Sequence, residues 1–230
     1  MDVSKTKKVL YITGGIGGES RELENHIEII KTIIKNCEIS AVVLYDTFAR
    51  INHENVKITI LKRKRSLNPI NKITNLIYWI YEVYKLKKKN KYDICFSNAD
   101  PSNLVNLISS LLAYKNFDNT ILRFAGLISN IDLYQSSKIY GIFYKLFYKI
   151  NYKLIYNKAR KISFISRSSL LDTIRYGIGR EKAVVSYNPI DVQKVFSSID
   201  EPLEEFQCVF ESPVIINSGR LTQPKGQWYL

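Results

Sequence analysis

Cysteine and histidine are scarce in this chain of 230 residues, which has three of the first and two of the second. Cys37, Cys95 and Cys208 lie far apart, without the spacing of a zinc site, and indicate reduced, buried thiols typical of the cytosol. His26 and His53 have no partner at metal-ligand spacing, and no serine lies in a G-x-S-x-G turn. We therefore expect no bound metal and no hydrolase of the serine–histidine type.

Long apolar runs and acidic side chains are also in short supply. Lysines interrupt every apolar run before it approaches the ~20 residues of a membrane span, and the apolar run near the N-terminus is too short for a signal peptide. Basic residues outnumber acidic ones by 34 to 21, and the net charge is +13. This charge suits nucleic acid, nucleotide phosphates or an anionic membrane, but no recognised nucleic-acid-binding module is present. We expect a cytoplasmic protein, peripheral to the inner face of the membrane, that binds no nucleic acid.

Strand-like and helix-like segments alternate along the chain. Short apolar runs predict strands, and apolar residues every three or four positions predict helices between them. This alternation is typical of right-handed crossovers, so the predicted fold is α/β, a Rossmann-like doubly wound parallel sheet with helices on both faces. The predicted strands are 8–13, 39–45, 56–61, 93–97, 120–124, 161–166 and 182–187.

Helical spacing also predicts which side chains face the core. In the helix after 62–65, the predicted core-facing stripe is Ile73, Leu76, Ile77, Ile80 and Tyr84. In the helix at 138–158, it is Ile139, Ile142, Leu146, Ile150 and Leu154. The tyrosines and lysines beside that second stripe form a basic, aromatic flank suited to anionic lipid, although a solvated helix face explains the same pattern.

Acidic residues gather near the end of an otherwise basic chain. We interpret 1–196 as one domain and 197–213, with its five carboxylates, as a linker. The run at 214–217 predicts a fresh buried strand, so 214–230 is interpreted as the start of a second domain.

The loop after the first strand is rich in glycine. Glycines there let a backbone approach a phosphate or a sugar, although a tight turn without a ligand uses them equally. Gly15 and Gly17 fit two positions of the dinucleotide fingerprint, but Ser20 occupies the third. Because Asp46 could contact a ribose at the end of the second strand, a NAD-dependent Rossmann enzyme stays an alternative.

Polar side chains follow two later strands, where an open parallel sheet binds its ligands. Asn98, Asp100 and Ser102 come after the strand at 93–97, and Arg123 ends the strand at 120–124. An arginine in this position also serves as an ordinary ion-pair partner. The sequence places these residues on one edge of the sheet and leaves their role open.

The segment from 159 to 191 resembles the end of the N-terminal domain in family 4 glycosyltransferases. The matching positions are Ser166, Gly179, Asn188, Pro189 and Asp191. The segment VIINSGRLTQPKG then resembles the opening of that family's second domain. The resemblance runs along the whole chain, specific in its last third and weak in its first half.

This resemblance implies the GT-B arrangement, in which the first domain holds the acceptor and the second binds a nucleotide-sugar. It implies that Arg220 and Lys225 contact the donor diphosphate without a metal, and that Gly17 and Gly18 let the first domain close over the donor. Arg123 stands where many relatives have histidine. The acceptor-side candidates are Arg123, Asn98, Asp100, Ser166 and Asn188.

The implied function is retaining transfer of a hexosyl group from a nucleotide-sugar, with no cofactor, onto a glycan or lipid-linked acceptor in polysaccharide or glycoprotein-glycan assembly. The family's main carboxylates would lie beyond Leu230, so we expect a truncated chain that is inactive by itself. A basic interaction module without catalysis is the remaining alternative.

Overall fold

A computed structural model describes residues 6–14, 20–45, 56–63, 68–127, 129, 138–188, 190, 192–202, 204–219 and 227. Its centre is one parallel sheet of seven strands in the order β3-β2-β1-β4-β5-β6-β7. The α/β, Rossmann-like prediction is confirmed. The strands are β1 (Lys7–Thr13), β2 (Cys37–Tyr45), β3 (Val56–Arg63), β4 (Ile94–Asn98), β5 (Thr120–Phe124), β6 (Lys161–Phe164) and β7 (Ala183–Val185).

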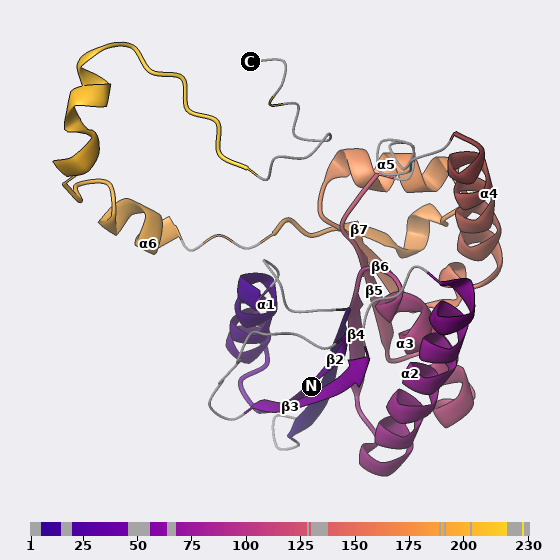
Figure 1. Ribbon diagram of the computed structural model, residues 1–230. Helices are drawn as coiled ribbons and strands as arrows, with labels where there is room; N and C mark the ends of the chain where they lie inside the picture. The colour runs from indigo at the N-terminus through magenta and orange to yellow at the C-terminus, as the bar shows by residue number, and fades with distance from the viewer. Residues whose placement is uncertain are drawn as a thin grey trace.

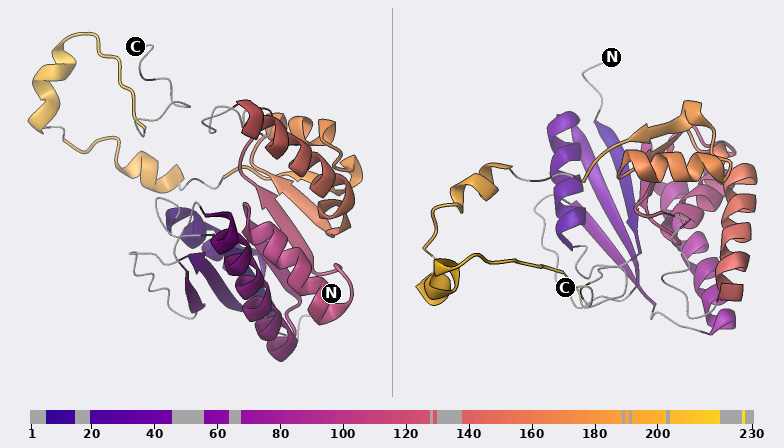
Figure 2. Two further views of the ribbon diagram at one scale, coloured as in Figure 1. Left: turned by 45° about the vertical axis from the view of Figure 1, so that its right-hand side comes forward. Right: turned by 90° about the horizontal axis from the view of Figure 1, so that it is seen from above.

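The helices form a layer on each side of the sheet. Figure 1 shows α1 on one side and α2, α3 and α4 on the other, and the view from above in Figure 2 agrees. The strand order reverses after β3, and right-handed crossovers in opposite directions put helices on opposite faces. The helices are α1 (Ser20–Ile33), α2 (Pro69–Asn90), α3 (Ser102–Tyr114), α4 (Lys138–Leu154), α5 (Arg167–Arg175) and α6 (Val192–Ser197), with short 3₁₀ turns η2 (Tyr156–Lys158), η3 (Arg180–Lys182) and η4 (Glu204–Glu211).

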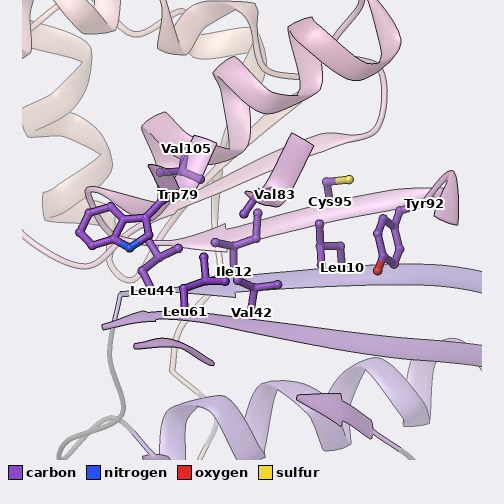
Figure 3. Packing of buried hydrophobic residues seen from close by; sticks show 10 residues of the cluster. All are labelled: Leu10, Ile12, Val42, Leu44, Leu61, Trp79, Val83, Tyr92, Cys95 and Val105. Atoms are coloured by element: carbon purple, nitrogen blue, oxygen red, sulfur yellow. The ribbon is translucent and has the colours of Figure 1, made fainter. Parts of the chain in front are cut away.

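The central strands are apolar on both faces because both faces are covered. Leu10 and Ile12 of β1 point toward α2, where they meet Trp79 and Val83 (Figure 3). The ring of Tyr45 stands edge-on to Trp79, with 4.9 Å between the ring centroids. Burial of these aliphatic and aromatic groups is the main stabilising term for this half of the sheet.

The two edge strands are built differently. Only Leu61 of β3 is buried, because the strand has a neighbour on one side alone, and its pairing with β2 shifts register between Val43 and Tyr45. Exposed Lys57, Lys62 and Arg63 lie along it. At the other edge, β7 has only three residues.

Both predicted helix faces differ from the observed ones. The α2 prediction was wrong for Ile73 and Ile77, which are exposed, because the helix packs instead through a face one position away. In α4 the prediction was wrong for the three described aliphatic residues of the stripe. Ile139 and Ile142 lie outside the residues whose side chains are described. The buried residues of α2 are Asn75, Trp79, Val83 and Lys87; the exposed aliphatics of α4 are Leu146, Ile150 and Leu154.

The inner face of α4 and η2 is aromatic. Tyr152 and Tyr156 are buried against Phe124 with edge-on ring contacts of 5.1 and 5.3 Å between centroids. Tyrosine suits these positions because its ring buries a large apolar area while its hydroxyl reaches a polar partner, as that of Tyr156 reaches Asp100. The predicted lipid-facing tyrosine flank is therefore part of the core at these two positions.

Residues 192–202 and 204–219 lie away from the sheet in an extended arm, drawn from orange to yellow in Figure 1. The strand predicted at 214–217 is not observed: this stretch is coil, and Ile215 is 89% exposed. A strand needs a neighbour for its backbone groups, and no described strand lies beside it. Among the described residues, no helix has the length and apolar character to cross a membrane.

Candidate functional site at the carboxyl edge of the sheet

The carboxyl ends of β4, β5 and β7 bring three of the predicted residues together. Asn98 and Arg123 are register partners on neighbouring strands. The Arg123 guanidinium donates to the backbone oxygen of Ser186 at 3.0 Å and to the Oδ1 atom of Asn188. Arg123 thus fastens the segment that follows β7 to the end of β5. Its two partners are 63 and 65 positions further along the chain.

Arg123 is almost fully covered, with 1% of its surface exposed. The Nη1 atom of Arg123 also donates a longer hydrogen bond, of 3.4 Å, to Ser163 Oγ. A buried guanidinium keeps its charge, so it creates a positive potential at this edge and fixes the loop that carries Asn188. Asn188 itself is exposed.

A chain of buried side chains supports Arg123 from below. The Nδ2 atom of Asn103 donates to the Arg123 backbone oxygen at 2.9 Å, and its Oδ1 atom accepts from Ser97 Oγ at 2.8 Å. Asn106 donates to the same Ser97 Oγ at 3.0 Å and accepts from Lys87 Nζ at 2.7 Å. Sequence reasoning missed this network, because asparagine and serine inside an apolar helix pattern carry no separate signal.

Asn98 and Ser102 lie where β1 and β4 end. Asn98 Oδ1 and Ser102 Oγ are buried, and neither has a hydrogen-bond partner in the part of the chain that the structure describes. A Cβ atom placed on Gly14 would lie 3.8 Å from that Ser102 Oγ, an ordinary contact distance, so the end of β1 lies next to the start of α3. Buried polar atoms of this kind mark a place where a ligand group or water completes the bonding.

Asp100 points toward the helical layer instead. Its Oδ1 atom accepts from the Tyr156 hydroxyl at 2.9 Å. Burial raises the pKa of this carboxyl to about 6, and hydrogen bonds from Tyr156 and Tyr148 oppose the shift. This buried carboxyl group is therefore held against the helical layer by its tyrosine partner.

Ser166 has a local role in the structure. It is the N-cap of α5, and its Oγ atom accepts from the Ser169 backbone N–H at 3.1 Å. The structure does not bring it into contact with Arg123. Arg220, Lys225, Gly17, Gly18 and Asp46, together with Pro189, Asp191 and His53, lie outside the described residues.

A cavity of about 240 Å³ opens beside the buried arginine, between α1 and the faces of β1, β4 and β5. Its walls are mostly apolar, and its polar lining comes from His26, Arg123, Ser186 and Tyr187. The Nδ1 atom of His26 lies 3.1 Å from the Tyr11 hydroxyl. Burial, followed by the Arg123 charge, lowers the pKa of His26 to about 4, so the imidazole is neutral at physiological pH. His26 shares the apolar face of α1 with Leu23, Ile27 and Ile30, and this spacing was the available signal.

No group of three or more potential metal-ligating side chains occurs in the described parts of the chain. The site therefore consists of amides, hydroxyls, one buried guanidinium and one carboxyl near neutrality. Such groups bind hydroxyl-rich and anionic molecules by hydrogen bonding and charge.

No protein-family model matches the chain. Its sequence is similar to that of the uncharacterized glycosyltransferase MJ1059 of Methanocaldococcus jannaschii, with 28% identity over 242 residues. That match covers 99% of this chain and 54% of the relative. The chain therefore spans about half the length of the curated relative it matches.

Solved structures give the same picture of the fold. The lipopolysaccharide outer core galactosyltransferase WaaB matches with a TM-score of 0.56 and 16% identity, over 80% of this chain and 46% of that one. Anabaena Alr3699/HepE, in complex with UDP and glucose, matches with a TM-score of 0.53 and 15% identity, over 81% of this chain and 46% of that one. Sucrose-phosphate synthase from Thermosynechococcus elongatus matches with a TM-score of 0.59 and 10% identity, over 90% of this chain and 53% of that one. The chain thus has the Rossmann-like α/β fold found in about half of each of these GT-B proteins, and its sequence is similar to that of a glycosyltransferase.

Proposed function

We propose that this chain is the acceptor-binding half of a family 4 glycosyltransferase that takes its sugar from a nucleotide-sugar. The observation that carries the proposal is the similarity to MJ1059 along 99% of the chain, on a fold shared with sugar transferases. The polar carboxyl edge of the sheet agrees with it, because amides, hydroxyls and a carboxyl suit a hydroxyl-rich acceptor. That Alr3699/HepE is in complex with UDP and glucose favours a UDP-sugar as the donor.

In this proposal the acceptor lies against Asn98 and Asn188, and Arg123 holds the Asn188 loop in place. Asp100, whose carboxyl group accepts from Tyr156, stays an acceptor-side candidate. Arg220 and Lys225 contact the donor diphosphate, and Gly17 and Gly18 let the backbone approach it. The positive charges of Arg220 and Lys225 would stabilise the leaving diphosphate, so the proposed reaction needs no metal and no cofactor.

We further propose retention of configuration at the transferred hexosyl group and a glycan or lipid-linked acceptor, reached from the cytoplasmic side of the membrane. Residues 1–196 would form the acceptor domain, 197–213 the linker and 214–230 the opening of the donor domain. On this division the chain alone binds an acceptor but does not complete transfer, because half of the donor site belongs to the second domain.

The test begins with the coding DNA that follows Leu230. A reading frame that continues into a second βα domain with two spaced glutamates supplies the protein for a transfer assay with a panel of nucleotide-sugars. Arg220→Ala and Lys225→Ala should each abolish transfer, by about 10²-fold or more, as expected for groups that stabilise developing charge. Arg180→Ala, which changes an exposed cation on η3, is the matched control and should be neutral. Full turnover in both donor-site variants would remove the assignment.

A further inference from the structure

Helix α2 has two opposite faces, and both contain apolar groups. One face is buried through Trp79 and Val83, as described above. The other presents large apolar side chains to solvent at intervals of three and four residues, so they form one continuous stripe about 16 Å long. Those residues, the α2 stripe, are Ile70 (69% exposed), Ile73 (59%), Ile77 (62%) and Tyr81 (56%).

Cations border the α2 stripe. Lys85 and Lys88 are exposed where the stripe continues past Tyr81, and Lys89 is exposed next to them. Glu82 is the single acidic residue of this 22-residue helix, and it pairs with Lys85 at 3.1 Å. The helix therefore combines exposed branched aliphatic groups with an excess of positive charge.

Helix α4 repeats the pattern on the same side of the sheet (Figure 1). Leu146, Ile150 and Leu154 are half-exposed or more at intervals of four residues. Lys149 and Lys153 are exposed beside them. Two helices of one layer thus present the same combination of apolar and basic groups to solvent.

The charge of this surface selects among the possible occupants. A second copy of the chain would bring the lysines of two such faces together, in a protein with a net charge of +13. A nucleic acid would neutralise the lysines but leave the isoleucines in water. An anionic bilayer accepts both groups, because its headgroups attract cations and its interface takes up aliphatic side chains.

We propose that the outer face of the α2 and α4 layer lies on an anionic lipid bilayer, with the α2 stripe as the principal contact. α2 begins after the carboxyl end of β3, so its first turns are near the edge of the sheet that carries the candidate site. A protein held in this way meets lipid-linked molecules at the membrane surface. The contact does not depend on the proposed transfer reaction.

The experiment is flotation of the whole chain with vesicles of phosphatidylcholine, alone or mixed in equal parts with phosphatidylglycerol. The wild-type chain should float with the anionic vesicles. Ile73→Gln with Ile77→Gln should weaken this binding by about tenfold or more, since each loses the transfer of an exposed side chain into the interface. Lys88→Gln with Lys89→Gln should weaken it by about 5-fold for each charge, and that loss should shrink as salt is raised.

Ile33→Gln and Lys35→Gln are the controls. Ile33 ends α1, on the other side of the sheet, and is 75% exposed. Both control variants should float like the wild type, and circular dichroism should show all variants folded. Failure of the wild type to float, or equal losses in the α1 and α2 variants, would overturn the proposal. So would a dimer in sedimentation that Ile77→Gln dissociates, because this result assigns the stripe to self-association. No sugar is present, so the outcome is independent of the transfer assay.

Discussion

The half of the sheet around β1 and β2 and the half around β4 and β5 are packed by different means. In the first, α2 covers the strands with Trp79, Val83 and other apolar groups. In the second, α3 enters the core with asparagine and serine, and its buried residues include Ser102, Asn103, Asn106 and Ser110. The first half is held by apolar burial that tolerates small shifts, whereas the second adds to its own apolar cluster a set of paired polar atoms that do not.

Lys87 joins the two halves. It lies on α2, but its Nζ atom donates to the Asn106 backbone oxygen, to Asn106 Oδ1 and to Ser110 Oγ, each at 2.7 Å. Burial lowers the pKa of Lys87 to about 8, which indicates how costly the ammonium would be without these acceptors. The ammonium group of Lys87, on the helix that covers the apolar half, thus holds Asn106 and Ser110 of the other half in place.

The largest effect should come from the apolar half. Trp79→Ala should reduce the free energy of unfolding by about 3–5 kcal/mol, because it removes a buried indole and leaves a cavity beside Tyr45. Urea denaturation measures this loss. Ile77→Ala on the same helix is the matched control and should change stability by less than about 1 kcal/mol, since its side chain is exposed. Similar losses in both variants would contradict the observed orientation of α2.

Removing one partner from the polar half should cost slightly less. Asn106→Leu should lower stability by about 3 kcal/mol, because Lys87 loses an acceptor while its charge stays buried. Adding Lys87→Met should recover part of the loss, since no buried charge then remains. A double-mutant cycle from urea denaturation measures this coupling, and strictly additive losses would show that the two residues are independent.

The smallest effect concerns the cavity beside α1. The pKa of His26 is lowered to about 4 in the folded protein, so between pH 6.5 and pH 4 the unfolded chain binds a proton that the folded chain does not. Stability should therefore fall as the pH is lowered through this window, by about 2–3 kcal/mol. His26→Gln should remove this part of the pH dependence, which unfolding experiments across the window can detect. An unchanged pH profile in the variant would locate the effect elsewhere.

The same contrast explains how much could be predicted from the sequence. Continuous apolar runs identified the β1 and β2 strands, and the alternation of elements identified the parallel sheet, because both signals depend on the backbone and on burial. The buried faces of α2 and α4 were mispredicted, since isoleucine and leucine are apolar on either face and only the partner surface decides. Placing Asn98 and Arg123 on one edge followed from topology, whereas the bond from Arg123 to Asn188 depends on a loop path that no local pattern specifies.

The edges of the sheet have a consequence for the behaviour of the protein at high concentration. An open edge strand can recruit the edge of another molecule and start ordered aggregation. At β3 this is opposed by lysine and arginine side chains and by the register shift against β2, both of which make a second strand fit poorly. At β7 the strand is too short to act as a template. Aggregation through the sheet edges is therefore opposed by charge at β3 and by the short length of the strand at β7. Only the protection by charge should weaken as salt is added.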